Sequence, residues 1–175
     1  DAFEQLRRVS EPGAAWYVAS PNRPDIWNAV SAVMALFGWR CVLIWVKDRF
    51  VLGRGDYHYR HEPIFHGWFE GAARLHPVPR NVDTVFECKR PGTSKAHPTM
   101  KPVDLIRPMI ENSTGANWLV GDPFGGSGST LIACAMTGRR ARLIEIDPRY
   151  CDVIRRRWTT WAKTHDQEPG PGALE

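Results

Sequence analysis

Residues 120–130 read VGDPFGGSGST, and the architecture of this chain follows most directly from that segment. The apolar run 118–120 leads into the acid Asp122, three glycines follow at 125, 126 and 128, and small residues begin at Ser129. This order predicts a strand, a tight turn and the N-terminus of a helix. Such a turn brings backbone N–H groups close to a ligand, and glycine suits it because glycine adopts the positive φ angles that other residues avoid.

The next apolar run, residues 141–144, ends in Glu145. A carboxylate at the tip of this strand can accept hydrogen bonds from ribose hydroxyls, so residues 118–145 predict half of a nucleotide-binding fold. No lysine follows Gly128, which excludes a P-loop, and Asp122 stands where a pyrophosphate site would avoid negative charge. S-adenosylmethionine fits better, because Asp122 would meet its ammonium group and Glu145 its ribose.

Several segments of this chain resemble one enzyme family. DPFGGSGST (122–130) resembles the cofactor-binding motif of the DNA methyltransferases that modify the exocyclic amino group of adenine or cytosine. HPTMKP (97–102) resembles the segment that immediately precedes this motif in the circularly permuted β-type order. IWVK (44–47) and YRHEPI (59–64) are similar to middle segments of the family, and EIDPRY (145–150) is similar to its ribose-binding strand end and the helix start that follows.

The resemblance implies a three-layer, Rossmann-like α/β fold in permuted order, with S-adenosylmethionine as the cofactor and double-stranded DNA as the substrate. It implies site-specific methyl transfer to the exocyclic amine of adenine or cytosine, as in restriction–modification. By the same resemblance the cofactor contacts are Asp122, Phe124, Gly126, Gly128 and Glu145, with Thr99 and Lys101 from the preceding segment. Two alternatives stay open: a non-catalytic cofactor- or DNA-binding remnant, and a nicotinamide-dinucleotide-binding oxidoreductase.

Members of this family carry an Asp/Asn-Pro-Pro-aromatic tetrapeptide that holds the target base, and in the permuted order it would precede residue 1. The similar tetrapeptide DPRY (147–150) follows the glycine-rich turn by one β–α unit, so we interpret it as a helix start with Pro148 in the first turn. We therefore expect no catalytic residue in this chain and a gap in the centre of its sheet. An upstream segment or a second copy in a homodimer would fill the gap, and residues 1–175 alone should bind cofactor weakly and methylate nothing.

Local patterns predict one methyltransferase domain, residues 1–167, followed by a flexible tail, 168–175. The alternation of strands and helices implies a mostly parallel sheet between helix layers. We expect strands at 14–19, 40–46, 59–66, up to 121 and at 141–146, and helices at 2–9, 25–37, 103–112, 129–136 and 148–162. Pro108 should kink or break its helix. Residues 67–100 show no periodicity, and 67–95 take the place of a short target-recognition insert.

The loop 47–58 combines cationic and aromatic side chains, which suit phosphate contacts and base stacking. A solvated surface loop is the alternative reading of the same residues. In the family that the chain resembles, this region faces DNA, which favours DNA contacts by Lys47, Arg49, Arg54, Tyr57 and Arg60.

Composition narrows the class of protein. The net charge of +4 permits nucleic-acid binding, and the four cysteines have no paired spacing, which indicates reduced thiols. The histidines His58, His61 and His66 lack a cysteine pair and a common strand face, so we expect no metal site. No apolar run approaches the ~20 residues of a membrane span, and no signal-peptide pattern opens the chain. We expect a cytoplasmic protein of a bacterium or phage, with no membrane partner.

Overall fold

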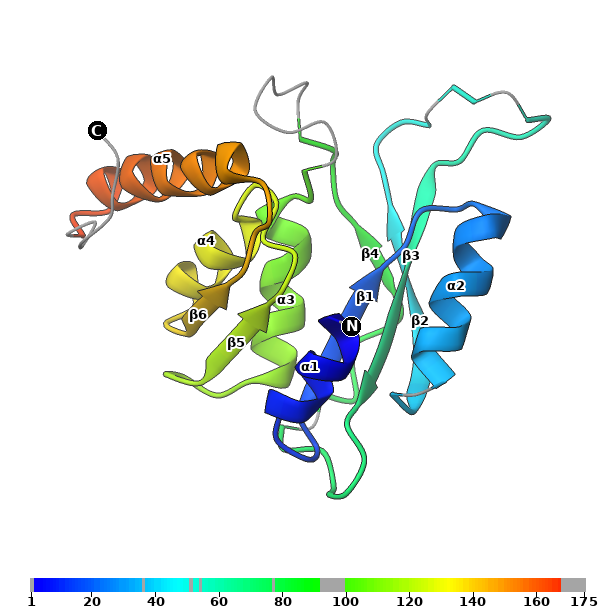
Figure 1. The fold of residues 1–175 in the computed structure, drawn as a ribbon. Coiled ribbons are helices and arrows are strands. Elements are labelled where there is room, and N and C mark those ends of the chain that lie inside the picture. The colour runs from blue at the N-terminus through cyan, green and yellow to red at the C-terminus, as the bar shows by residue number, and fades with distance from the viewer. Residues whose placement is uncertain are drawn as a thin grey trace. The chain divides into compact units, whose positions relative to one another are not determined.

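The computed structural model describes residues 2–35, 37–50, 52–53, 55–76, 78–91 and 100–167. The chain divides into two compact units, Asp1–Arg90 and Pro91–Glu175, and each is described by itself. Figure 1 shows strands and helices in both units. Thr99 and Arg54, two of the predicted site residues, lie outside the described residues.

The first unit is built on a four-stranded sheet with the order β1-β3-β2-β4. Strand β3 pairs antiparallel with both β1 and β2, whereas β2 and β4 are parallel. The expected mostly parallel sheet is therefore wrong for this unit, because β2 and β3 form a hairpin, and strands joined directly by a loop run antiparallel. The elements are α1 (Ala2–Val9), β1 (Ala15–Ala19), α2 (Pro24–Ala35), β2 (Trp39–Val46), β3 (His61–Trp68) and β4 (Val85–Glu87).

Aromatic packing forms the core of this unit. Its buried members are Trp16, Met34, Phe37, Phe65 and Phe69, and Phe3 and Leu6 of α1 pack against them. The indole of Trp16 lies so close to Gly67 that a β-carbon there would approach it to 2.7 Å. Glycine is thus needed on β3 to let this indole cross the strand. Trp16 Nε1 also donates to the Phe37 carbonyl at 3.2 Å, which joins β1 to the end of the α2 segment.

Strand β4 lies within the segment for which the sequence predicted no regular structure. It is three residues long, too short for a periodic pattern. Backbone bonds hold it: Ile44 N donates to Thr84 O at 2.8 Å, and Cys88 N donates to Val46 O at 3.0 Å. The indole of Trp45 adds a bond from Nε1 to the Cys88 carbonyl at 2.7 Å. Long-range pairing with β2 therefore creates this strand.

The second unit is a β–α–β segment flanked by helices, with the parallel pair β5–β6 at its centre. Ile110, Ala133 and Cys134 form its buried cluster, and Val120 and Ala141 pack against it from the strands. Strand β6 ends at Leu143, earlier than predicted, while α4 has the predicted bounds. The elements are α3 (Val103–Ser113), β5 (Leu119–Asp122), α4 (Ser129–Met136), β6 (Arg140–Leu143) and α5 (Pro148–Thr164).

Pro108 does not break α3, so of the two effects expected from the sequence, a kink or a break, the break is wrong. The helix continues from Val103 to Ser113 with Pro108 inside it. Proline removes one backbone hydrogen bond of the helix, but Leu105, Met109 and Ile110 are buried on one side. Burial of these side chains offsets the lost bond, since each buried apolar side chain contributes about 1.5–3 kcal/mol.

Within the described residues, no helix combines the length and the apolar character that crossing a bilayer requires.

Candidate functional site

The glycine-rich turn that joins β5 to α4 has a backbone held by its own hydrogen bonds. Gly125 N donates to Ile144 O at 2.9 Å, and Gly128 N donates to Gly125 O at 2.8 Å. Gly126 and Gly128 adopt positive φ angles of 53° and 79°. A β-carbon at Gly128 would lie 3.1 Å from Ile154 Cγ2. The structure thus places two predicted site residues, Gly126 and Gly128, at positions where backbone conformation and packing favour glycine.

Asp122 joins the two ends of this turn. Its Oδ1 accepts from Phe124 N at 3.0 Å, and its Oδ2 accepts from the Thr130 hydroxyl at 2.6 Å. The carboxylate is half-buried at the carboxyl end of β5. Each carboxylate oxygen can accept a further hydrogen bond. Asp122 can therefore hold the turn and still present negative charge to a cationic group.

Glu145 closes the other side of the turn. Its Oε2 accepts from Gly126 N at 2.7 Å, and its Oε1 accepts from Asp147 N at 3.0 Å. These backbone N–H groups, Asp147 first, hold the pKa of the Glu145 carboxyl below its ordinary value. An ionised carboxylate has about four acceptor sites, so Glu145 retains sites for hydroxyl donors of a ligand.

Three solvent-exposed apolar side chains lie close to Asp122 and Glu145 in the sequence. Phe124 is 60% exposed, Ile144 69% and Ile146 97%. Phe124 was predicted as a cofactor contact, whereas Ile144 and Ile146 were not. The signal was available, since both isoleucines directly flank Glu145. Exposed apolar groups beside polar ones suit a ligand with a flat apolar ring and hydroxyl groups.

The backbone of Lys101 lies next to the first residue of α4, Ser129. Its backbone carbonyl accepts from the Ser129 hydroxyl at 2.7 Å. The structure thereby joins the segment that precedes α3 to the glycine-rich turn. Six of the seven predicted cofactor residues fall within residues 101–145 of one unit, and the seventh, Thr99, lies outside the described residues.

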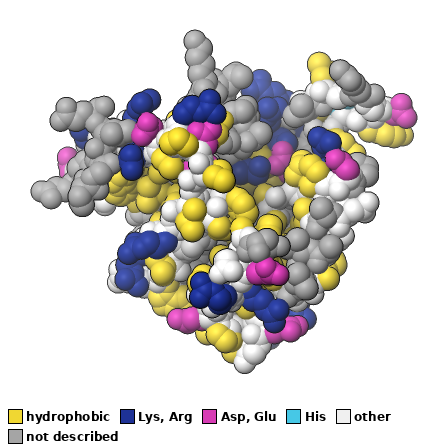
Figure 2. All heavy atoms as spheres, viewed as in Figure 1, with side chains coloured by type: hydrophobic (Ala, Val, Ile, Leu, Met, Phe, Trp, Pro, Cys, Tyr) yellow, Lys and Arg dark blue, Asp and Glu magenta, His cyan; other side chains and the backbone are white. Residues whose placement is uncertain are grey.

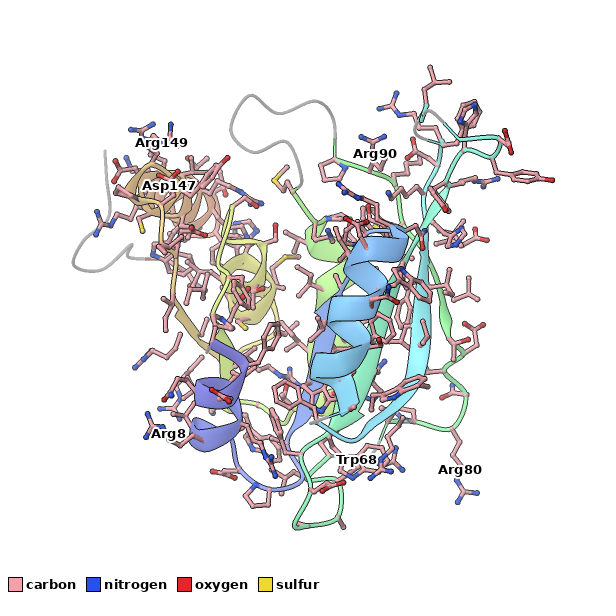
Figure 3. The ribbon with its side chains drawn as sticks, turned by 45° about the vertical axis from the view of Figure 1, so that its right-hand side comes forward. Arg8, Trp68, Arg80, Arg90, Asp147 and Arg149 are labelled. Carbon is pink, nitrogen blue, oxygen red and sulfur yellow. The ribbon has the colours of Figure 1, made fainter. Side chains whose placement is uncertain are left out.

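The tetrapeptide at 147–150 is a helix start, as the sequence predicted. Asp147 is the N-cap of α5, and its Oδ1 accepts from Arg149 N at 2.9 Å. Arg149 also reaches back, with Nη2 2.6 Å from Asp147 Oδ2, and Figure 3 shows the two side chains together at the start of α5. The Arg149 guanidinium lowers the pKa of Asp147. This carboxylate is thus engaged in capping its own helix.

Lys47, which the sequence predicted as a DNA contact, is buried. Its side chain is 6% exposed, and Nζ lies 2.5 Å from Glu62 Oε1. The ammonium also lies over the Trp45 ring, 5.0 Å from its centroid. Because a buried ammonium is stable only when it is paired, Lys47 is structural here: it ties β2 to β3 at the base of the loop.

The loop beyond this pair exposes three of the other residues predicted to contact DNA, Arg49, Tyr57 and Arg60. Figure 1 shows the connection between β2 and β3 extending past the ends of both strands. Tyr57 is 88% exposed, and Arg49 is exposed with Asp48 Oδ2 3.9 Å from its Nε. Arg60 is exposed too, although its Nε donates to the Lys47 carbonyl at 2.9 Å. Phe50 and His58 stack with centroids 5.4 Å apart, which gives the loop an internal contact.

Basic side chains also occur elsewhere on the surface. Figure 2 shows lysine and arginine side chains at several places on the face in view, in keeping with the net charge of +4.

His66 and His58 have different surroundings. His66 is buried, stacks on Tyr17 and has Nδ1 3.0 Å from the Trp16 carbonyl, and burial lowers the pKa of its ring. His58 lies in the loop, where its Nδ1 accepts from Gly53 N at 3.3 Å. The described part of the chain contains no cluster of three His, Cys, Asp or Glu side chains that could hold a metal ion.

Known proteins resemble this chain in sequence. Residues 72–156 match a family model described as DNA methylase. YubD of Escherichia coli strain K12, a protein named as a methylase, is 36% identical over 128 residues, which cover 71% of this chain and 55% of YubD. The Type II methyltransferase M.Cfr9I of Citrobacter freundii is 37% identical over 165 residues, which cover 87% of this chain and 52% of that enzyme. The chain thus spans about half the length of these curated relatives.

A solved structure shares the fold. The crystal structure of the M1.HpyAVI–SAM complex superimposes with a TM-score of 0.71 over 87% of this chain and 79% of that chain, at 24% sequence identity. The chain thus resembles DNA methyltransferases in sequence, and it shares the fold of the M1.HpyAVI–SAM complex.

Proposed function

We propose that the second unit binds S-adenosylmethionine at the glycine-rich turn. The observation that carries the proposal is the bond from Gly126 N to Glu145 Oε2, which closes the turn between two carboxylates, Asp122 and Glu145. Asp122 would accept hydrogen bonds from the cofactor's ammonium group, and Glu145 from its ribose hydroxyls. Phe124 and Ile146, both strongly exposed, would cover the faces of the adenine ring.

The charge of the site supports this ligand over a dinucleotide. Two carboxylates at neighbouring strand ends would repel a pyrophosphate, whereas the methionine part of S-adenosylmethionine carries an ammonium and a sulfonium. The cofactor supplies an activated methyl group. The chain's own residues bind and orient it, and orientation of reacting groups is a large part of such catalysis.

The full reaction that we propose is methyl transfer to the exocyclic amine of adenine or cytosine in double-stranded DNA. The similarity of residues 72–156 to the DNA methylase model and of the chain to the Type II methyltransferase M.Cfr9I supports this substrate. A paired base is inaccessible inside the duplex, so such an enzyme must take its target out of the stack. For the first unit we propose DNA contacts by Arg49, Tyr57 and Arg60, with Arg54 from the same loop. Lys47 would act indirectly, by holding the base of the loop.

Calorimetric titration of S-adenosylmethionine tests the cofactor proposal. We expect saturable binding to the wild-type chain and none of a nicotinamide dinucleotide. In Asp122→Asn the amide keeps an oxygen for the Phe124 N–H but loses the negative charge, so affinity should fall about 10- to 100-fold.

Asp152→Asn is the matched control, because it removes the same charge from a partly exposed acid of α5 whose Oδ1 lies 3.4 Å from Arg155 Nη1. Its affinity should equal that of the wild type. A folded wild-type chain that binds the dinucleotide and not S-adenosylmethionine would contradict the proposal.

A further inference from the structure

The side chain of Arg157, in α5, forms hydrogen bonds to the glycine-rich turn. Its Nη1 lies 2.6 Å from the Ser127 carbonyl, 2.9 Å from Ser127 Oγ and 3.2 Å from Ser129 Oγ. Both serines are buried. One guanidinium nitrogen thus serves the turn and the first residue of α4 together. No motif in the sequence analysis singled out this arginine.

The hydrogen bond from Arg157 to the Ser127 carbonyl holds the peptide group between Ser127 and Gly128 in one orientation. The peptide that joins Ser127 to Gly128 has its oxygen bound by Arg157 and its N–H bound by Gly125 O at 2.8 Å. Of the two residues that it joins, Gly128 has a positive φ of 79°, and Gly126, with a φ of 53°, precedes Ser127. Glycines have more conformational freedom than other residues, so without an external partner the orientation of this peptide would be weakly defined.

The contact extends to the segment before α3. Ser129 Oγ accepts from Arg157 and donates to the Lys101 carbonyl at 2.7 Å. Arg157 therefore links three parts of the second unit that carry the predicted cofactor residues: the turn, the start of α4 and the segment at Lys101.

The Arg157 guanidinium is partly buried against neutral hydrogen-bond acceptors. Among the described residues its recorded partners are the two serines, all neutral oxygens, and no carboxylate pairs with it. Burial lowers the pKa of Arg157, which shows the cost of keeping a cation there, although an arginine remains charged. A methionine or leucine would fill this space without that cost, so packing alone does not account for an arginine.

We propose that Arg157 is a positioning residue of the cofactor site, one that fixes the Ser127–Gly128 peptide without touching the ligand. The proposal rests on cofactor binding at this turn. It predicts that the shape of the turn, and hence the position of Gly126 N–H against Glu145, depends on a side chain of α5.

The test compares Arg157→Met with Arg156→Met in the full chain. Methionine keeps most of the aliphatic stem and removes the donors, and Arg156 is an exposed arginine of the same helix. We expect Arg157→Met to bind S-adenosylmethionine about tenfold more weakly and Arg156→Met to bind like the wild type. Arg157→Lys, which keeps one charged donor group, should recover affinity to within about threefold of the wild type. A purely packing role would give no recovery by lysine beyond that of methionine.

Amide hydrogen exchange supplies a readout that does not need the cofactor. In Arg157→Met the Gly128 amide should exchange about tenfold faster, while the Ala133 and Cys134 amides inside α4 keep their protection. If Arg157→Met does not fold, Ser127→Ala takes its place. It keeps the Ser127 carbonyl but removes the hydroxyl that Arg157 and Ser129 Oγ contact, and we expect a smaller increase of about threefold at Gly128.

The outcomes separate the two proposals. Unchanged affinity and unchanged Gly128 exchange in a folded Arg157→Met chain would overturn the role of Arg157. Faster Gly128 exchange in a chain whose wild type binds no S-adenosylmethionine would uphold the support of the turn by Arg157 and reject the proposed function.

Discussion

At the scale of single residues, Glu145 both builds the site and would bind the ligand. Its two oxygens accept from Gly126 N and Asp147 N, so it fixes the turn on one side and the start of α5 on the other. Asp122 does the same for Phe124 N and Thr130. Because these carboxylates already have backbone partners, they are held in place before any ligand arrives. Such preorganisation reduces the entropy lost on binding.

Two glycines of this segment should respond differently to alanine. Gly128 has a φ of 79°, and a β-carbon there would contact Ile154, so Gly128→Ala should lower the free energy of unfolding by about 1–3 kcal/mol and weaken cofactor binding. Gly121 is the control, because a β-carbon there would have no heavy atom within 4 Å. Gly121→Ala should change stability by less than about 1 kcal/mol. Urea denaturation and calorimetry of both variants make the comparison, and equal effects would refute it.

At the scale of elements, the β2–β3 hairpin separates a fixed base from an exposed loop. The base is held by Lys47 against Glu62 and by Arg60 Nε against the Lys47 carbonyl. Lys47 N also donates to Arg60 O at 2.8 Å, so the strands stay paired beyond the end of β2. The loop residues beyond this base, such as Tyr57, are exposed. The hairpin therefore presents cationic and aromatic side chains on a defined support.

The loop should carry part of the affinity for DNA. Arg49→Gln removes one phosphate-binding charge, so the slope of log affinity against log salt should fall by about 1. Tyr57→Ala removes a stacking surface and should weaken binding by about 1–3 kcal/mol at any salt concentration. Fluorescence anisotropy with a labelled duplex measures both.

Arg8→Gln is the control for the arginine, because Arg8 is exposed on α1, where its Nε donates to Gln5 at 2.8 Å. Thermal unfolding of the loop variants should match the wild type. A salt slope in Arg8→Gln reduced as much as in Arg49→Gln would show a general charge effect and would speak against the loop.

At the scale of the whole molecule, hydrogen-bonded carboxylates in both units tie stability to pH. The backbone N–H of Asp147 leads the groups that lower the pKa of Glu145, the Arg149 side chain lowers that of Asp147, and the backbone N–H of Arg90 lowers that of Asp48. A carboxyl whose pKa is lower in the folded state binds protons more readily after unfolding. Its contribution to stability is therefore present above the unfolded pKa and is lost as the pH falls through the folded value.

Acid should accordingly destabilise the wild-type chain more than Glu145→Gln. Above about pH 5 the urea midpoints of the two proteins should change with pH in parallel, since the buried His66 is common to both. Between about pH 4.5 and 3 the wild-type midpoint should fall more steeply than that of Glu145→Gln. Glutamine at 145 can accept from one of the two N–H groups but does not titrate in this range. Urea titrations at four pH values test this, and parallel slopes for the two proteins would contradict it.

The second unit was largely predictable from sequence because its signals are local. The bounds of α4, the helix start at Asp147 and the turn between β5 and α4 each depend on residues next to one another in the chain, such as Gly128 before Ser129. The antiparallel β1–β3–β2 sheet and the strand β4 were missed, because they depend on pairing between distant segments. The burial of Lys47 was missed for the same reason: its partner Glu62 lies fifteen residues away, in another strand.

The amino-acid sequence by itself therefore determined the glycine-rich turn, its flanking acids and the resemblance to a family. Turns and helix caps can be predicted in this way because neighbouring residues set the backbone conformation. Only the tertiary structure decided which polar groups remain available. It turned Lys47 inward against Glu62, exposed Ile146 beside Glu145, and placed Arg157 against a peptide thirty residues earlier in the chain. The physical reason is that burial and the pairing of charges are properties of the space around a side chain, and that space is filled by segments far apart in the sequence.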